Sequence, residues 1–183
     1  SSMILVALLA SLPFWIRIRQ CYVQLDSCPD NIARIPVFLN IIKYFTSFPP
    51  IWLTAAASLG YTHPQMPYYV SLAAFINTTY SFLWDTFMDW GLISFHRDGR
   101  IIRRQRALFP WFLYFLIVPI NLVLRFSWLI NRLPGMSHIH SSIIVLIIEI
   151  GEVFRRAIWF IFRIEWEIVN QQDKSIEKNV ADK

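Results

Sequence analysis

Long apolar segments alternate with short polar connections along the chain. The apolar segments lie at 3–16, 36–59, 67–95, 107–131 and 141–167. Their hydrophobic residues come in blocks and lack the alternation of a β-barrel strand, so we expect helices. A helix needs about 20 apolar residues to cross a bilayer, and all the segments except the first reach that length. The pattern therefore predicts an all-α, polytopic transmembrane helical bundle of about five spans.

The first apolar segment, MILVALLASLPFWI, is shorter than the others. It is too short for a full span, and the preceding Ser1 and Ser2 offer neither the charged region nor the cleavage site of a signal peptide. We therefore expect the chain to begin partway through a helix and to form the C-terminal part of a larger bundle.

The basic residues of the polar connections indicate an orientation. Lys and Arg number three at 17–34, none at 60–66, five at 96–106, one at 131–140 and three at 170–183. Cytosolic loops are enriched in Lys and Arg, so the first and third connections and the C-terminus are predicted to be cytosolic.

The C-terminal residues NQQDKSIEKNVADK (170–183) are polar and show no apolar periodicity. Such a segment buries little apolar surface, so we expect it to be disordered. The sequence is accordingly divided into a transmembrane domain at 1–168 and a polar cytosolic tail at 169–183.

Composition agrees with a membrane protein. Hydrophobic residues make up 56% of the chain and charged residues 16%, whereas about a quarter of a typical soluble domain is charged. The net charge of +5 reflects the cytosolic loops, so the expected partner is the lipid bilayer and not nucleic acid.

Pro49 and Pro50 interrupt the second apolar segment. Proline removes a backbone donor and clashes with the preceding turn, so the helix should kink or break there. Such a break is typical of a discontinuous helix beside a transport site, and equally of an ordinary kink.

Eight charged residues lie well inside the apolar segments, away from the segment ends. They are Lys43, Asp85, Asp89, Arg125, Glu149, Glu152, Arg155 and Arg156. Each costs on the order of 3 kcal/mol at the centre of a membrane, so its presence needs a reason. Positive and negative charges are equal in number. A balanced salt-bridge network that locks the bundle is one explanation, and a path for a charged substrate is the other.

Helical spacing arranges these residues on faces. Asp85 and Asp89 are four residues apart and share one face. Two further stripes contain Arg125, Trp128 and Arg132 with Asn131 beside them, and Glu149, Glu152, Arg156 and Arg163. Arg155 points about 100° away from Arg156, so the two adjacent arginines are expected to do different jobs.

The arginines suit an oxyanion as substrate. A guanidinium binds phosphate bidentately and keeps its charge, while the carboxylates would hold the arginines and exchange partners with the anion. The sequence contains no Gly-rich phosphate loop, nucleophile elbow or metalloprotease helix, and no Cys, Asp or Glu near His138 and His140 completes a metal site. We therefore expect a protein that is not an enzyme and uses no cofactor or metal.

Five motifs match one family in order and spacing. They are LPFWIRIRQC, NIIKYFTSFP, YSFLWDTFMDWGL, LVLRFSW and EVFRRAIWFIFRIEWE. The chain from about residue 11 to 168 thus resembles the EXS domain. This is the C-terminal membrane domain of eukaryotic phosphate exporters of the Xpr, Pho and Syg type, and fungal Golgi proteins of the Erd type share it.

The resemblance implies a path for inorganic phosphate. By motif the path contains Lys43, Tyr44, Asp85, Asp89, Arg125, Trp128, Glu152, Arg155 and Arg156, with Asn131 at a position where the exporters carry Gln. Three arginines would coordinate the anion, the acidic residues would orient them, Lys43 would form a station on the cytosolic side, and Trp128 would act as a gate or wall.

The resemblance favours the Erd branch, because no SPX domain occurs in these 183 residues. It implies transport of inorganic phosphate from the Golgi lumen to the cytosol, across the Golgi membrane. One alternative is a Golgi sorting or scaffold protein that retains ER lumenal proteins and works with the machinery that recycles glycosyltransferases. Another is a fragment of a plasma-membrane phosphate exporter. An ER location and a homodimer are left open.

Overall fold

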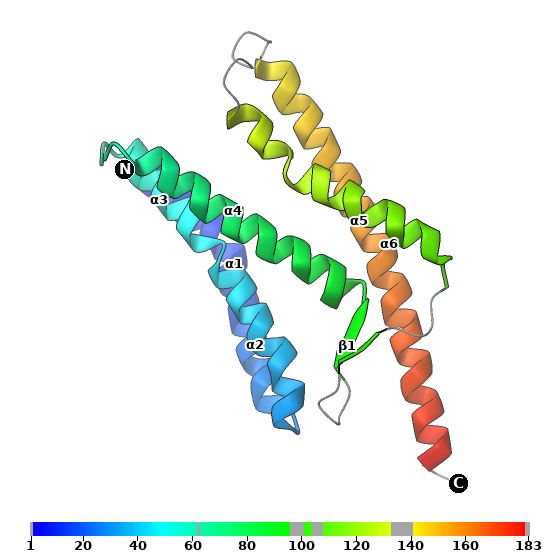
Figure 1. Cartoon of the computed structure of the whole chain (residues 1–183). Helices are drawn as coiled ribbons and strands as arrows, with labels where there is room; N and C mark the ends of the chain where they lie inside the picture. Colours follow the sequence, from blue (N-terminus) through cyan, green and yellow to red (C-terminus); the bar gives the residue numbers. More distant parts are fainter. Residues whose placement is uncertain (1, 62, 96–100, 104–107, 133–140, 182–183) are drawn as a thin grey trace. The chain divides into compact units, whose positions relative to one another are not determined.

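The computed structural model describes residues 2–61, 63–95, 101–103, 108–132 and 141–181. Figure 1 shows the elements α1 (Ser2–Ser27), α2 (Asn31–Phe45), α3 (Phe48–Ser58), α4 (Met66–Trp84), β1 (Ile93–Phe95), β2 (Ile101–Arg103), α5 (Trp111–Arg125) and α6 (Ser141–Ala181). A π-helix, η1 (Asp85–Asp89), follows α4, and a 3₁₀-helix, η2 (Ser127–Arg132), follows α5. The described chain is therefore almost entirely helical, and the short ribbon of β1 and β2 is the part that the sequence pattern did not predict.

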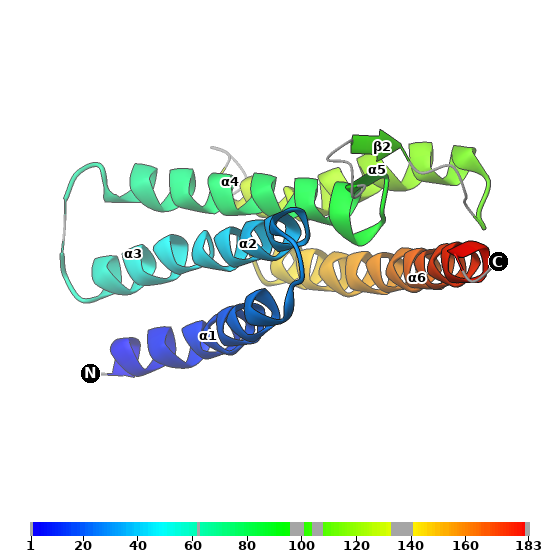
Figure 2. The ribbon, with the colours of Figure 1, turned by 90° about the horizontal axis from the view of Figure 1, so that it is seen from below.

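The chain divides into two compact units. The first contains Ser1–Ser81 and Phe95–Arg100, and the second contains Phe82–Ser94 and Ile101–Lys183. In the first unit α1 packs against both α2 and α3, as the two views in Figures 1 and 2 agree. The ring of Phe48 joins them, with centroids 6.2 Å from Phe14 and 5.3 Å from Trp15.

The predicted break at Pro49 and Pro50 is confirmed. Helix α2 ends at Phe45 and α3 begins at Phe48, which places both prolines in the first turn of α3, where no backbone donor is needed. The hydroxyl of Ser47 donates to Oδ1 of Asn77 at 3.1 Å. The hydroxyl of Thr46, which donates to the carbonyl of Lys43 at 2.7 Å, also lies 3.1 Å from Oδ1. A polar side chain of α4 therefore contacts both hydroxyls at the break.

Two segments that were predicted to be irregular are helical. The connection at 17–34 is a helix except at 28–30, because α1 continues to Ser27 and α2 starts at Asn31. Buried Ile18 and Cys21 keep the helical period there, while the arginines of this stretch face outward. The expected disordered end at 170–183 is likewise wrong for its described part, since α6 runs to Ala181.

The third and fourth apolar segments are shorter helices than predicted. At 67–95 the α-helix ends at Trp84 and changes to the π-helix η1, and at 107–131 it is limited to Trp111–Arg125. In the described part of the chain, α1 alone is long and apolar enough to cross a membrane by length and composition. The arrangement with about five spans stays a prediction.

The second unit is built on α5 and α6. Its core contains Trp90, Tyr114 and Phe162, and the ring of Phe162 lies 5.5 Å from Trp90 and 5.1 Å from Tyr114, centroid to centroid. Gly91 (φ 61°) follows η1 in the left-handed region, and a Cβ at this position would overlap the indole of Trp166. The end of η1 therefore depends on a glycine that lets the backbone approach α6.

Buried Glu165 of α6 fixes the start of α5. Its Oε1 accepts hydrogen bonds from the backbone N–H groups of Leu108 at 2.8 Å and Phe109 at 3.5 Å. Its Oε2 accepts the hydroxyl proton of Tyr114. We call these four residues the Glu165 clamp. At the other end of α5, Leu124 lies against Gly151 of α6, so the two helices run in opposite directions.

Candidate functional site

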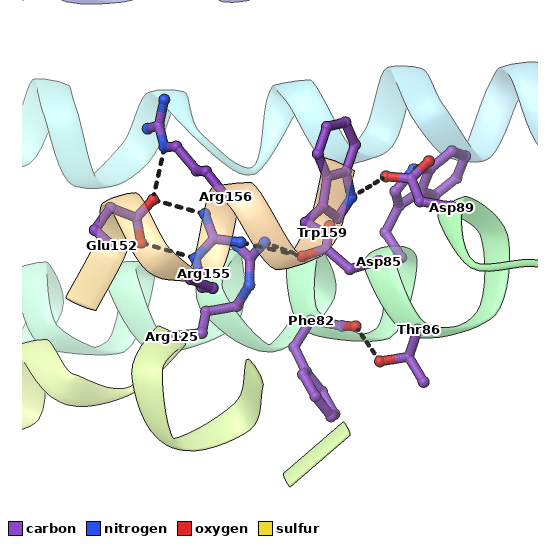
Figure 3. A network of polar contacts seen from close by, with 10 residues as sticks. Phe82, Asp85, Thr86, Asp89, Arg125, Glu152, Arg155, Arg156 and Trp159 are labelled. Atoms are coloured by element: carbon purple, nitrogen blue, oxygen red, sulfur yellow. Dashed lines mark hydrogen bonds and ion pairs between the residues drawn. The ribbon is translucent and has the colours of Figure 1, made fainter. Parts of the chain in front are cut away.

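The carboxylate of Asp85 joins three helical elements of the second unit, as Figure 3 shows. Asp85 is the first residue of η1 and is 5% exposed. Arg125, the last residue of α5, donates from Nη2 to its Oδ2. Arg155 of α6 donates from Nη1 to the same oxygen at 3.4 Å. One buried carboxylate oxygen is therefore shared by guanidinium groups from two helices.

Glu152 holds Arg155 from one turn earlier on α6. Nε of Arg155 donates to Oε2 of Glu152 at 2.7 Å, and Nη2 donates to Oε1 at 2.6 Å. This bidentate pair fixes the plane of the guanidinium group. Arg155 is 8% exposed, and a cation buried to that extent requires close partners to offset its desolvation.

Arg156 differs from its neighbour. Its Nε donates to Oε1 of Glu152 at 3.0 Å, but its side chain is 74% exposed. The prediction that the two arginines do different jobs agrees with this geometry. Together, Asp85, Arg125, Glu152, Arg155 and Arg156 are called the Asp85 network.

The stripe of charged residues that helical spacing predicts on α6 does not coincide with the buried face of this helix. Glu149 and Arg156 are exposed, whereas the buried positions of this helix include Arg155, Phe162 and Val169. These three recur every seven residues, which is the spacing of a helix that packs along another helix. The apolar contact with α5 therefore decides which arginine turns inward.

Asp89, the last residue of η1, has its own set of donors. Nε1 of Trp84 donates to its Oδ1 at 3.1 Å and Nε1 of Trp159 to its Oδ2 at 3.0 Å. Nη1 of Arg163 also donates to Oδ1, at 2.9 Å. Asp89 is buried, so these three bonds satisfy a charge that water does not reach. We call this set the Asp89 cluster.

The π-helix explains how both aspartates reach α6. Its widened turn closes with the N–H of Trp90 donating to the carbonyl of Asp85 at 2.9 Å, five residues back. The hydroxyl of Thr86 donates to the carbonyl of Phe82 at 2.9 Å, which satisfies another group of this turn (Figure 3). Such turns are frequently found at functional sites.

The Asp85 network and the Asp89 cluster together contain more positive than negative side chains. Among the described residues, the cations are Arg125, Arg155, Arg156 and Arg163, and the anions are Asp85, Asp89 and Glu152. Of the eight charged residues noted in the sequence, Lys43 belongs to the first unit and Glu149 is exposed, and the other six stay balanced. The extra positive charge comes from Arg163, which bonds Asp89. The excess charge lies on the solvent side, because the side chains of Arg156 and Arg163 are 74% and 41% exposed, and there it attracts anions.

The other residues predicted for the phosphate path belong neither to the Asp85 network nor to the Asp89 cluster. Lys43 and Tyr44 are half-buried in α2 of the first unit, with Nζ of Lys43 5.0 Å from the centroid of the Tyr44 ring. Trp128 is half-buried in η2. Asn131 belongs to the same 3₁₀-helix, but its side chain lies outside the described ones, as do His138 and His140 entirely.

Comparison with known proteins decides the family. A model described as the EXS family matches residues 1–169, nearly the whole chain. The chain belongs to the EXS family. The resemblance deduced from the motifs is thereby confirmed, and the protein is a helical member of a family of membrane domains.

Several proteins are similar to this EXS chain. Protein ERD1 homolog 1 of Schizosaccharomyces pombe is 35% identical over 94% of the chain and 48% of its own length. Phosphate transporter PHO1 homolog 8 of Arabidopsis thaliana is 31% identical over 91% of the chain and 22% of its length. Solute carrier family 53 member 1 of Homo sapiens is 30% identical over 90% of the chain and 24% of its own length. The EXS chain thus spans about half the length of the first relative and about a quarter of the other two.

Sequence reasoning missed part of the EXS site. It placed Arg163 on a stripe without assigning it a partner, and it did not single out Trp84 or Trp159. The bond between Trp84 and Asp89 joins residues five apart, which is a π-helical spacing that α-helical periodicity does not reveal.

Proposed function

We propose that this EXS chain transports inorganic phosphate across a membrane and binds the anion at the Asp85 network. The observation that carries the proposal is the convergence of Arg125 and Arg155, from two helices, on one buried oxygen of Asp85. A carboxylate oxygen between two guanidinium groups occupies the place that a phosphate oxygen would take. The net positive charge of the site supports the same ligand.

Transport requires that the arginines exchange partners. In the empty site Asp85 neutralises Arg125 and Arg155, which lowers the cost of burying them. An arriving phosphate would displace the Asp85 carboxylate, while Glu152 keeps Arg155 in its orientation. The returning carboxylate would then weaken the hold on phosphate and favour its release. A site that binds through exchange avoids trapping the anion.

The names of the relatives support this choice of substrate. Two similar proteins of Arabidopsis thaliana are phosphate transporters of the PHO1 type by name. The identities are 31% and 28%, and the chain spans about a fifth of each relative. The family thus includes phosphate transporters, and the site described above has the donors that phosphate requires.

The membrane arrangement is part of the proposal. About five spans would place the connections at 17–34 and 96–106 and the C-terminus in the cytosol, by the excess of basic residues there. At about 1.5 Å per residue, the 41 residues of α6 extend over roughly 60 Å, about twice the hydrocarbon thickness. The C-terminal turns of α6 would therefore project into the cytosol.

The remaining predicted residues have proposed roles as well. Lys43 and Tyr44 would form the station on the cytosolic side, Trp128 a wall or gate, and Asn131 a further contact. The Golgi membrane is the proposed location and lumen to cytosol the proposed direction, as the resemblance to the Erd branch implies. The 35% identity to ERD1 homolog 1 over 94% of the chain supports this branch.

Phosphate flux into proteoliposomes tests the proposal. Arg155→Ala should lower the initial rate about tenfold or more, since hydrogen bonds to charged groups contribute about 1.5–3 kcal/mol each. Arg19→Ala is the matched control, because it removes the same charge from an exposed position of α1. Size-exclusion chromatography and a thermal melt establish that each variant is folded.

The opposite result has a defined meaning. If folded Arg155→Ala moves phosphate as fast as the wild type, the Asp85 network is structural and not a transport site. The alternative function is then a sorting or scaffold protein that acts with the glycosyltransferase-recycling machinery. A wild-type protein that moves no phosphate in either orientation would count against transport as such.

A further inference from the structure

Asn121 lies on the face of α5 that turns toward the Asp85 network. Tyr114, one end of this face, bonds Glu165 of α6, and Arg125, the other end, bonds Asp85. Asn121 is seven residues after Tyr114 and four before Arg125, so it shares their face. It is 2% exposed, and it is therefore enclosed between the clamp and the network.

Neither polar atom of Asn121 has a partner among the described residues. Its Nδ2 and Oδ1 are both buried and unbonded, and the same is true of Nε of Arg125 and Nε1 of Trp128. These three residues follow one another at helical spacing along α5 and η2. Buried polar groups without partners are rare in proteins, so each calls for an explanation.

The chemistry of these free atoms matches one kind of ligand. Asn121, Arg125 and Trp128 together offer N–H donors that have no acceptor among the described residues, and a guanidinium in such a row attracts an anion. Oδ1 of Asn121 adds a single acceptor. A ligand that fits must carry several acceptor oxygens, a negative charge and at least one proton of its own. Hydrogen phosphate and dihydrogen phosphate have all three.

We infer that Asn121 is a contact residue for phosphate that also distinguishes phosphate from sulfate. This inference rests on the proposed function and adds to it a residue that the family motifs do not contain. Nδ2 of Asn121 donates to one phosphate oxygen, and Oδ1 accepts the proton of a P–OH group. Sulfate carries no proton near neutral pH, so the lone pairs of Oδ1 would face those of a sulfate oxygen.

A buried Asn121 side chain without hydrogen-bond partners costs stability, so its replacement should affect stability and phosphate binding in different ways. Leu has the same branched arrangement of side-chain heavy atoms as Asn and leaves no buried polar atom without a partner. The removal of the unpaired amide should therefore offset the larger volume of Leu, and Asn121→Leu should keep about the stability of the wild type. A residue kept for packing would show the opposite. Weaker binding together with an unchanged or raised melting temperature therefore indicates a ligand contact.

The test measures uptake of radiolabelled phosphate into proteoliposomes that hold the full chain, with and without competing sulfate. Asn121→Leu should raise the KM for phosphate about tenfold, the size of one hydrogen bond to a charged group, and should make sulfate a better competitor relative to phosphate. Asn170→Leu, the same substitution in the C-terminal part of α6, is the matched control. Asn121→Asp, which keeps the shape but replaces the donor by a negative oxygen, should raise the KM further.

The outcomes separate this inference from the function on which it rests. If the wild type moves phosphate and Arg155→Ala does not, but Asn121→Leu keeps the wild-type KM and sulfate competition, the assignment of Asn121 is overturned and the proposed function stands. If the wild type moves no phosphate, both are overturned. Should Asn121→Leu fail to fold, an unchanged KM in Asn121→Asp would overturn the assignment in its place.

Discussion

The two ends of the contact between α5 and α6 use buried carboxylates in different ways. In the Glu165 clamp the carboxylate accepts hydrogen bonds from two backbone N–H groups and a tyrosine hydroxyl, which are neutral groups that do not leave the protein. In the Asp85 network the carboxylate meets two guanidinium groups, and one of these keeps a buried N–H unbonded among the described residues. Both ends are buried, so burial does not distinguish them.

The two ends differ in whether their buried polar groups have hydrogen-bond partners among the described residues. A buried polar group with all its partners stabilises the fold and specifies the packing of the helices around it. A buried group that lacks partners costs stability, and proteins retain such groups mostly at functional sites. The clamp therefore has the properties of a structural element, and the network has those of a binding site. Substitutions at the two ends should separate stability from transport.

The largest expected effect is on the clamp. Glu165→Ala leaves the N–H groups of Leu108 and Phe109 and the hydroxyl of Tyr114 without their acceptor, which should lower the free energy of unfolding by about 3 kcal/mol or more. The unfolding midpoint in denaturant or by temperature, measured in detergent, checks this. Glu167→Ala removes an exposed carboxylate two residues away and is the control. A midpoint equal to that of the control would show that the clamp is not structural.

The next effect is on transport and comes from the network. Asp85→Asn removes the charge that competes with phosphate for Arg125 and Arg155, so the anion should bind more tightly and leave more slowly. Both the KM and the maximal rate of phosphate flux should fall, the rate by about tenfold if the exchange is worth one charged hydrogen bond. Flux measured over a range of phosphate concentrations separates the two parameters.

Asp26→Asn, which neutralises an exposed carboxylate of α1, controls for the change in net charge. A rise in KM for Asp85→Asn would contradict exchange between carboxylate and phosphate. It would mean that Asp85 orients the arginines for the anion and does not compete with it.

Much of this architecture was predictable from the pattern of apolar residues. The helical class, the break at Pro49 and Pro50 and the pairing of buried aspartates with arginines all follow from periodicity and from the cost of buried charge. The extent of the helices was not predictable in the same way. Residues 17–27 are polar on average but helical, because the packing of α1 extends to buried Ile18 and Cys21. Residues 170–181 continue α6 beyond buried Val169.

The arrangement of the site was only partly predictable. Spacing alone grouped Arg156 with Glu152 and Arg163, but the contact of α6 with α5 selected Arg155 as the inward residue. The π-helix altered which donors reach Asp89, and no local sequence signal announces a widened turn. Tertiary contacts thus decided between faces of the helix that the sequence pattern left nearly equivalent.

The smallest expected effect is that of Arg156→Ala, which compares the exposed with the buried arginine of the Asp85 network. Arg156 makes one bond to Glu152 from an exposed side chain, and an exposed ion pair on a helix is worth about 0.5 kcal/mol or less. Arg156→Ala should therefore change the melting temperature little and the phosphate flux by about twofold at most. Because Arg155 and Arg156 share Glu152, Arg156→Ala even leaves that carboxylate free for Arg155. A loss of flux as large as that of Arg155→Ala would mean that Arg156 turns inward during transport, and the path would then extend along both neighbouring faces of α6.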